Sequence, residues 1–420
     1  MSPTPPTPSG SDHPLGRRIT KRLDKLAALT DEPGRITRLY LSPAHRKAAD
    51  LVAGWMADCG MSPRIDAVAN VVGRYEAASP DAPVLVIGSH IDTVIDAGKF
   101  DGNLGVVTAI EVVDRLHRAG RRLPFAIEIV AFGDEEGSRF PSTLGGSRLL
   151  AGSFDKRILD ECDIDGTSRR AALLAFGCDP NRIDHDAQRT EQVLGYVEVH
   201  IEQGPVLEAR NLSVGVVTAI NGATRGTIEV RGVGGHAGTI PMHLRRDAFS
   251  AAAEMALAIE RRAASEADLV ATVGQIEIPG GVVNSVPGLA RFTLDIRSPS
   301  DERRTRAVAD IQAEMEAIAV RRRVELSVAL GYQAPAALCD ARLSGLLAAA
   351  VAERGIEVLR LPSGAGHDAM SFREKWPMAM LFVRCRGGIS HSPAEHASIE
   401  DIDISARVLA DFIDQLAATL

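Results

Sequence analysis

The sequence predicts an α/β protein with two domains, one built on a mixed, largely parallel sheet and the other an inserted α+β domain of the ferredoxin-like type. Apolar strands alternate with helices along residues 17–212 and 331–420, and these strands are apolar throughout, as in parallel sheets covered on both faces. Residues 213–330 instead contain a complete strand–helix–strand–strand–helix–strand series, which can form its own two-layer core. Because neither flanking segment completes a sheet alone, we expect the two to rejoin as one main domain.

The main domain is expected to follow a short tail. Residues 1–16 have proline and serine where a signal peptide would need an apolar region, so we expect them to be disordered. Residues 17–74 carry apolar residues at helical spacing and then extend into a strand around VVGRY. Later strands are expected at 83–90, 125–133, 196–204 and 378–385, and later helices at 105–120 and 403–420.

The inserted domain has strands with alternating apolar residues and two amphipathic helices. We expect strands at 224–233, 271–278, 290–298 and 324–330, and helices at 245–263 and 301–322.

Composition and charge exclude several classes of partner. The net charge of -8 provides no basic surface for phosphates, and only 4% of the residues are aromatic, so we expect no nucleic-acid partner. No segment approaches 18 uninterrupted apolar residues, so we expect no membrane span. The five cysteines are odd in number and scattered without a CxxC pair, which is typical of reduced thiols. These observations predict a cytoplasmic protein.

Histidines and carboxylates gather in glycine-rich turns, several of which follow predicted strands. In open α/β sheets, the carboxyl ends of the strands are where ligands bind. The five turns contain His90 and Asp92; Asp101; Glu135 and Glu136; His200, Glu202 and Gln203; and His391 and Glu395.

This set of side chains has the imidazole and carboxylate character of a site for two divalent metal ions, with zinc or manganese as candidates. A single histidine at a strand end is more often a satisfied polar residue, and a lone aspartate beside glycine is usually a turn former. Five such turns in one chain are harder to explain in that way. Cysteine is absent from all five, which argues against a structural zinc site.

The motifs resemble a known family over nearly all of the chain from about residue 20. In order, they are GSHIDTV, GKFDGNLG, FGDEEGSRF, HIEQGPVLE, GGHAGTIPM, VNSVPG, LDIRS, SGAGHDAM and GGISHSPAE. Together with an inserted ferredoxin-like domain, they resemble the hydantoinase/carbamoylase group of M20-type metallohydrolases. That group contains N-carbamoyl-L-amino acid hydrolases, beta-ureidopropionases and allantoate amidohydrolases.

The resemblance implies a role for each residue of the main domain, which would then be the metal-binding catalytic domain. Asp101 would bridge two divalent ions, one also held by His90 and His200, the other by Glu136 and His391. Asp92 would orient His90, a common companion of a metal-bound imidazole. Glu135 would be the general base, taking a proton from water and passing it to the leaving nitrogen.

The inserted domain would form a homodimer and a lid and would add substrate contacts. The resemblance implies that His236 stabilises the oxyanion from the other subunit. Asn284 and Arg297 resemble residues that hold the substrate carboxylate, and Gln203 resembles a polar contact to the ureido or carboxylate group. An arginine at a strand end can also be only a surface charge. His367 and Asp134 are left without a role.

The implied activity is hydrolysis of a linear amide or ureido carbon–nitrogen bond in a small carboxylate substrate. The stretches SRFPSTLGGSR and RCRGGISHSPAE resemble the allantoate amidohydrolases more than the carbamoylases. N-carbamoyl-L-amino acid hydrolase, or beta-ureidopropionase, is the alternative. An M20-type aminoacylase or dipeptidase would use the same metals, but His200 and Gln203 argue against it. A binding protein that has kept only the fold would lack a ligand or the base, and neither is missing.

Overall fold

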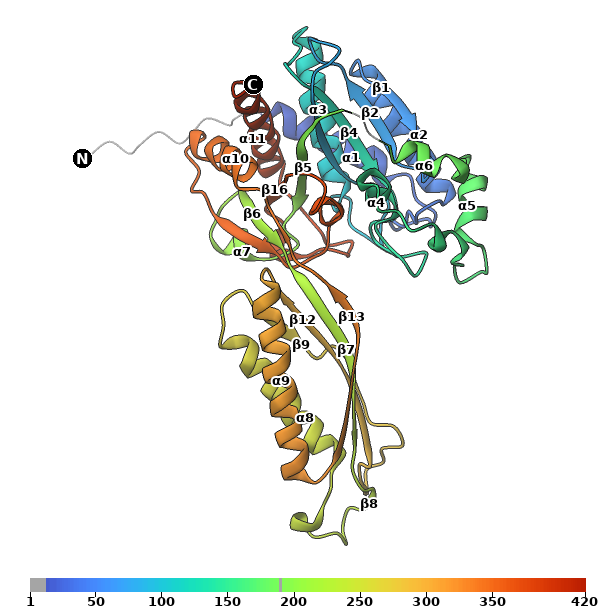
Figure 1. Cartoon of the computed structure of the whole chain (residues 1–420), viewed down its shortest axis with the longest axis vertical. Helices are drawn as coiled ribbons and strands as arrows, with labels where there is room; N and C mark the ends of the chain where they lie inside the picture. The colour runs from blue at the N-terminus through green and yellow to red at the C-terminus, as the bar shows by residue number, and fades with distance from the viewer. Residues whose placement is uncertain (1–12, 189–190) are drawn as a thin grey trace, which may run out of the picture. The chain divides into compact units, whose positions relative to one another are not determined.

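The computed structural model describes residues 13–188 and 191–420, which fold into two compact units (Figure 1). The first unit runs to Thr218 and continues in Cys339–Leu361 and His367–Leu420, and the second comprises Ala219–Leu338 and Pro362–Gly366. These divisions lie a few residues after the boundaries of 213 and 330 expected from the sequence. The reason is that two strands run past those positions: β6 (Val214–Ile220) pairs with a strand of the first unit, and β13 extends from Glu325 to Ala334.

The first unit is built on a nine-stranded sheet with the order β1-β2-β4-β3-β5-β16-β6-β14, in which β15 also pairs with β6. The strands are β1 (Ser62–Ile65), β2 (Val71–Tyr75), β3 (Val84–His90), β4 (Ala126–Phe132), β5 (Val193–Ile201), β6, β14 (Ala337–Leu338), β15 (Arg360–Ser363) and β16 (Met378–Val383). The central strands β4, β3, β5 and β16 are parallel, whereas β1, β2, β6 and β14 pair antiparallel. The predicted mixed, largely parallel sheet is confirmed.

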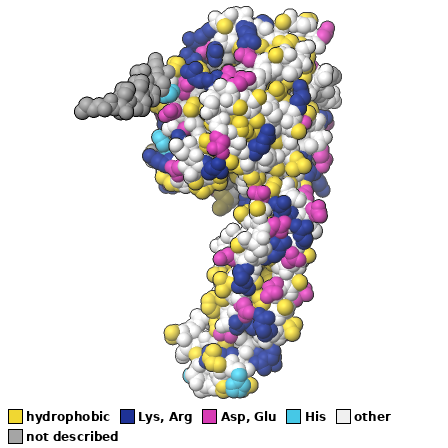
Figure 2. All heavy atoms as spheres, turned by 90° about the vertical axis from the view of Figure 1, so that its left-hand side faces the viewer, with side chains coloured by type: hydrophobic (Ala, Val, Ile, Leu, Met, Phe, Trp, Pro, Cys, Tyr) yellow, Lys and Arg dark blue, Asp and Glu magenta, His cyan; other side chains and the backbone are white. Residues whose placement is uncertain are grey.

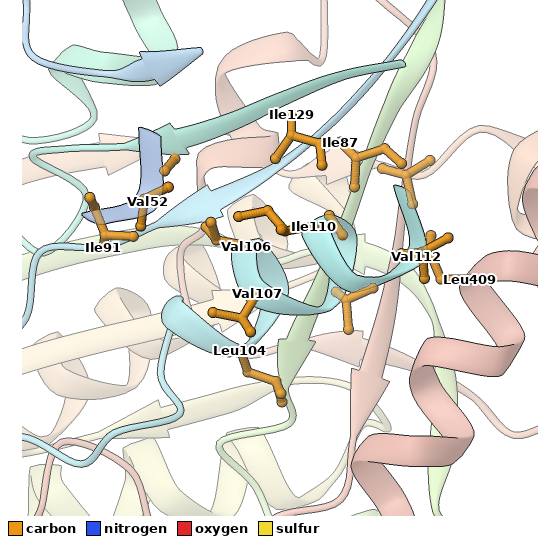
Figure 3. Packing of buried hydrophobic residues seen from close by; sticks show 14 of the residues in the cluster. Val52, Ile87, Ile91, Leu104, Val106, Val107, Ile110, Val112, Ile129 and Leu409 are labelled. Atoms are coloured by element: carbon orange, nitrogen blue, oxygen red, sulfur yellow. The ribbon is translucent and has the colours of Figure 1, made fainter. Parts of the chain in front are cut away.

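Helices pack against this sheet because their apolar residues recur at helical spacing. The helices are α1 (Pro14–Ala27), α2 (Pro43–Asp58), α3 (Asn103–Arg118), α4 (Gly145–Ala151), α5 (Arg169–Phe176), α6 (Ile183–Asp186), α7 (Val206–Ala209), α10 (Ala341–Glu353) and α11 (Ile399–Ala417). Helix α3 carries the centre of the core: Val106 and Ile110 lie beside Ile87 of β3 and Ile129 of β4 (Figure 3). The buried strands β3 and β4 therefore hold the turns that follow them in fixed positions.

The tail expected at residues 1–16 is too long at its C-terminal end, because α1 begins at Pro14. Proline is favourable in the first turn of a helix, where its missing N–H costs nothing. The amides of Leu15 and Gly16 both donate to Oδ1 of Asp403, at 3.0 Å each, which fixes this end of the helix. Residues 1–12 lie outside the described residues.

The second unit is a two-layer βαββαβ structure, the series of the ferredoxin-like fold. Its elements are β7 (Gly222–Arg231), β8 (Gly235–His236), α8 (Ala248–Ala264), β9 (Val270–Thr272), β10 (Ile276–Glu277), β11 (Ser285–Val286), β12 (Leu289–Ser298), α9 (Asp301–Arg322) and β13. The main sheet has the order β10-β12-β7-β13, with β9 also pairing with β12, and all these pairs are antiparallel. Helices α8 and α9 pack on one face of it (Figure 1). The strand expected at 271–278 is thus divided into β9 and β10.

The surface and the thiols agree with the composition. Figure 2 shows basic and acidic side chains interspersed on the face that it presents, with no continuous basic area. Among the described residues, no helix is both long and apolar enough to cross a bilayer. All five cysteines are free.

Candidate metal centre

The turns that carry the predicted metal ligands of the first unit meet at one edge of its sheet. Strands β3, β4, β5 and β16 are parallel, so their carboxyl ends point the same way. His90 is the last residue of β3, and Glu135 and Glu136 follow β4. His200 lies at the end of β5, and the segment after β16 contains His391. Residues far apart in the sequence are therefore brought together by the sheet.

Asp101, in the turn before α3, lies at the centre of this arrangement. Its Oδ1 is 3.1 Å from Nε2 of His200 and 3.5 Å from Nε2 of His90. Its Oδ2 is 3.4 Å from Nε2 of His391, which is also 3.4 Å from Oε2 of Glu136. Two groups of possible ligand atoms, His90–Asp101–His200 and Asp101–Glu136–His391, therefore share one carboxylate.

The two buried histidines each use one ring nitrogen to fix the ring. Nδ1 of His200 donates to the carbonyl of Ile201 at 2.9 Å, and Nδ1 of His90 donates to the carbonyl of Asp92 at 3.0 Å. In both rings Nε2 then faces Asp101 and, in the neutral tautomer, is free to bind a cation. Nε2 of His200 is buried and lies 3.1 Å from Oδ1 of Asp101, but it has no hydrogen-bond partner among the described residues, because both atoms are acceptors in this tautomer. This orphaned nitrogen is an observation that fits a metal ligand.

Asp92 acts on the neighbouring loop more than on His90. Its carboxylate is 3.9 Å from Nδ1 of His90, which bonds instead to the main-chain carbonyl of Asp92. The two carboxylate oxygens accept the amides of Glu135 and Glu136, at 3.3 and 3.4 Å. Asp92 therefore orients His90 through its backbone, and its side chain links the β3 turn to the β4 turn.

Glu135 and Glu136 place two carboxylates beside the histidines. Oε2 of Glu135 is 3.9 Å from Nε2 of His90, and both glutamate side chains are largely buried. Burial raises the pKa of Glu135 well above its usual range, His90 opposes this, and the charge of Glu136 adds to it. Burial also raises the pKa of Glu136, to about 8. Such crowded carboxylates are electrostatically costly, and divalent cations would offset the cost.

Asp134, which the sequence left without a role, closes the loop that carries these two glutamates. Its backbone lies in the left-handed region, with a φ of 72°, where aspartate is tolerated better than most residues. Its Oδ2 accepts the amide of Gly145 at 3.2 Å and pairs with the guanidinium of Arg169. Asp134 and Arg169 are each only 1% exposed. This buried ion pair anchors the loop that carries Glu135 and Glu136 to helix α5.

Removing one partner of the pair should be strongly destabilising. We expect Asp134→Asn to lower the free energy of unfolding by about 3–5 kcal/mol, because the buried charge of Arg169 would lose its closest carboxylate and keep only that of Glu161, at 3.4 Å. The measurement is urea denaturation of the variant and wild type. Asp50→Asn is the matched control: Asp50 pairs with Arg46 on the exposed face of α2, so little change is expected. Equal unfolding midpoints for Asp134→Asn and wild type would refute the anchoring role.

Gln203 and Glu395 surround Asp101. Nε2 of Gln203 donates to Oδ2 of Asp101 at 2.8 Å, and the hydroxyl of Ser390 donates to the same oxygen. Oε1 of Glu395 accepts the amides of Phe100 and Asp101, at 2.8 and 3.1 Å. Gln203, expected to contact substrate, thus lies beside the shared carboxylate. The sequence showed Glu395 only as a member of a turn, and nothing in it indicated that its side chain reaches the Asp101 turn.

His367 is buried next to His200. The centroids of the two rings are 4.5 Å apart in an edge-on arrangement, and His367 forms a possible ligand group with Glu198 and His200. Burial is the main cause that lowers the pKa of His367 well below its usual range, and the neighbouring His200 lowers it further, so the ring is neutral. Its position indicates that it packs against His200 and limits the rotation of that ring.

The remaining three predicted residues belong to the second unit. His236 and Asn284 are neighbours there: β8 pairs with β11 through His236 and Ser285, and the carbonyl of Asn284 accepts the amide of Ala237 at 2.9 Å. Arg297 lies on β12 and lines a cavity of about 570 Å³ together with Arg225, Thr272 and Gly364. Its guanidinium donates to both oxygens of Asp295, at 2.9 Å each, and to the carbonyl of Gly364 at 2.6 Å.

His236 and Asn284 lie at one end of the sheet of the second unit, and Arg297 lies at the other. Leu289 pairs with Arg231 at the end of the sheet where β7 leads into β8 and β11 leads into β12. Arg297 pairs with Ala223 at the opposite end. Leu289 and Arg297 are eight residue steps apart along an extended strand, a rise of about 27 Å. Figure 1 shows β8 beside the C-terminal end of β7, away from Ala223. One small substrate therefore cannot contact Arg297 and Asn284 of the same subunit.

Comparison with known proteins gives matches over almost the whole chain. The family model described as peptidase family M20/M25/M40 matches residues 86–415. An N-carbamoyl-L-amino acid amidohydrolase of Geobacillus stearothermophilus is 39% identical, covering 96% of this chain and 98% of that protein. An allantoate deiminase of Glycine max is 38% identical over 94% of this chain and 88% of that protein. The crystal structure of a hydantoinase/carbamoylase family amidase from Burkholderia multivorans superposes with a TM-score of 0.90, at 31% identity over 96% of this chain and 98% of that one.

Proposed function

Because the chain belongs to peptidase family M20/M25/M40, we propose that it is a two-metal amidohydrolase that cleaves a ureido or linear amide carbon–nitrogen bond in a small carboxylate substrate. The observation that carries the proposal is the position of Asp101 between two groups of possible ligand atoms, of which only His391 is exposed. A carboxylate shared in this way is what two neighbouring divalent ions need. The relatives supply the reaction class, since their names describe amidohydrolases and deiminases of ureido compounds.

The residues present fit two divalent cations. Imidazole nitrogens and carboxylate oxygens without cysteine suit zinc or manganese. His90 and His200 would hold one ion, Glu136 and His391 the other, and Asp101 both. When bound, the two ions would lower the pKa of a water molecule and polarise the scissile carbonyl.

The proton transfers fall to Glu135. Its carboxylate also forms a possible ligand group with His90 and Glu136, but it belongs to neither of the two groups that share Asp101. The backbone amides of Glu135 and Glu136 are both held by Asp92, which fixes how the two side chains diverge. Glu135 can therefore accept a proton from the attacking water and deliver it to the departing nitrogen.

Within this reaction class, we propose allantoate as the preferred substrate. The proposal depends on the resemblance of SRFPSTLGGSR and RCRGGISHSPAE to the allantoate amidohydrolases. N-carbamoyl-L-amino acids are the second candidate, favoured by the 39% identity to an enzyme of that name over 98% of its length. Both substrates present a ureido group near a carboxylate, so the same catalytic residues would serve either.

Ammonia release with manganese or zinc supplied tests these proposals. The panel is allantoate, an N-carbamoyl-L-amino acid and N-carbamoyl-beta-alanine, with an N-acetyl amino acid as the control for an aminoacylase, scored by its deacylation. We expect the highest kcat/KM on allantoate. Preference for a carbamoyl substrate would overturn the substrate proposal alone, whereas activity only on the N-acetyl compound would overturn the reaction class.

We further propose that the active enzyme is a homodimer. The separation of Arg297 from His236 and Asn284 in one subunit supports it, because these residues could serve one substrate only if they came from two subunits. Arg297 would then bind the carboxylate, and His236 and Asn284 of the partner subunit would complete the oxyanion and substrate contacts.

Subunit complementation distinguishes this arrangement from a monomeric site. Glu135→Gln and His236→Ala subunits are each expected to be nearly inactive alone. After they are mixed and allowed to exchange, about a quarter of the wild-type activity should return, because random pairing makes half of the dimers mixed and each of these has one intact site. The measurement is ammonia release before and after mixing. No recovery, with exchange verified by mass, would contradict contribution of His236 across subunits.

We propose a cytoplasmic location as well. The free cysteines support it, because disulfides form mainly in oxidising compartments.

A further inference from the structure

We infer that Arg38 is a positioning residue of the proposed metal centre: its guanidinium ties the segment that follows His90 at the end of β3 to the turn that carries Asp101. This inference rests on the proposed function. Arg38 lies in the segment between α1 and α2, far in the sequence from either turn, and it is 1% exposed.

Two edges of the guanidinium reach the two ligand-bearing segments. Nε donates to the carbonyl of Ile91, between His90 and Asp92, at 2.7 Å. Nη2 donates to Oδ1 of Asn103 at 2.7 Å, and Nδ2 of Asn103 donates in turn to the carbonyl of Asp101 at 2.9 Å. One planar group therefore sets the spacing between the backbones that present the first histidine and the shared carboxylate.

The third edge anchors Arg38 to the fold. Nη1 donates to the carbonyls of Leu26 and Leu29 at the C-terminal end of α1, at 2.8 and 3.0 Å, where a positive charge is favourable. The backbone of Arg38 also pairs with Thr93, since its amide donates to the Thr93 hydroxyl at 2.9 Å and its carbonyl accepts the Thr93 amide at 3.0 Å. The guanidinium is thus held on every side and has no freedom to shift.

The hydrogen-bond partners of the Arg38 guanidinium indicate a role beyond stabilising the fold. Among the described residues, the hydrogen-bond acceptors of the guanidinium are all neutral, and the carboxylates of Asp92 and Asp31 act on it electrostatically without bonding to it. A buried cation that is not hydrogen-bonded to an anion is an expensive way to stabilise a fold. Its fork can, however, bond to Ile91 and Asn103 at once in one plane, which a lysine ammonium cannot do. We therefore expect the affinity for the metal to depend more on the planar shape of the guanidinium than on its charge.

The test is the affinity for manganese of the isolated full-length protein, measured by competition with a chelator. Arg38→Lys keeps the charge and loses the fork, and we expect its affinity to fall about 10- to 100-fold, the usual effect of losing a residue that supports metal ligands. Asn103→Ala keeps Arg38 and removes the side chain that connects its guanidinium to the carbonyl of Asp101. The affinity of this variant for manganese should therefore fall too. This second variant keeps the test decisive if Arg38→Lys does not fold.

Arg304→Lys is the matched control. Arg304 is also buried and bonded to Thr224 and Asp301, but in the second unit, so its substitution should leave the metal affinity unchanged. Folded Arg38→Lys or Asn103→Ala protein with wild-type affinity would overturn the inference, as would an equal loss in Arg304→Lys. Failure of the wild-type protein to bind manganese or zinc would instead overturn the proposed function.

Discussion

A Glu135→Gln variant is expected to keep the metal content of the wild type and to lose turnover by about 10²- to 10⁴-fold, the contribution usual for a positioned acid–base group. Glutamine preserves the shape of the side chain but cannot take a proton from water. Oε2 of Glu135 is 3.9 Å from Nε2 of His90, which places its carboxylate beside the proposed metal centre. The measurements are elemental analysis of the purified protein and kcat for ammonia release.

The neighbouring residue supplies the control for this experiment. Glu136 shares a ligand group with Asp101 and His391, so Glu136→Gln is expected to lose metal as well as activity. The contrast between two adjacent glutamates tests the division of roles directly. Loss of metal from Glu135→Gln, or normal turnover by it, would show that the base has been assigned to the wrong carboxylate.

The sequence could predict which turns come together because the rule involved is general. Strands that are apolar throughout become the parallel centre of the sheet, and polar residues just beyond their carboxyl ends meet at one edge. His90, Glu136 and His200 all satisfy this rule, and the structure brings them within reach of Asp101.

The contacts that hold those residues in place could not be predicted in the same way. Arg169 pairs with Asp134 across 35 residues, and Arg38 bonds to Asn103 across 65. Neither arginine lies in a turn or beside another polar motif, and buried arginines are uncommon, so a surface position was the natural expectation. Their partners are decided by how α1, α5 and the sheet pack, which no local pattern encodes.

The distance between Arg297 and Asn284 also depends on packing that the sequence does not show locally. Both residues lie in motifs of the inserted segment, and the resemblance gave both to one carboxylate. The register of β12 against β7 places Arg297 at one end of the sheet, whereas Asn284 lies beside β11 and β8 at the other end. Only the pairing of the strands reveals that one subunit cannot use both.

Asp101→Asn is expected to remove both metal ions, whereas His391→Ala should remove only one. Asp101 belongs to both ligand groups, and an asparagine amide cannot bridge two cations with two oxygens. His391 belongs to only one group and is the most exposed of the proposed ligands, with 52% of its side chain accessible. Elemental analysis should therefore give about one ion per subunit for His391→Ala and almost none for Asp101→Asn.

Activity should follow the metal content. Divalent ions contribute several kcal/mol to such reactions, so Asp101→Asn should lower kcat by about 10³-fold or more. Chelation of the wild-type protein should give the same loss, and added manganese or zinc should restore activity to the wild type but not to Asp101→Asn. If Asp101→Asn kept one ion and His391→Ala kept none, His391 rather than Asp101 would be the residue on which both ions depend, and the shared-carboxylate assignment would be wrong.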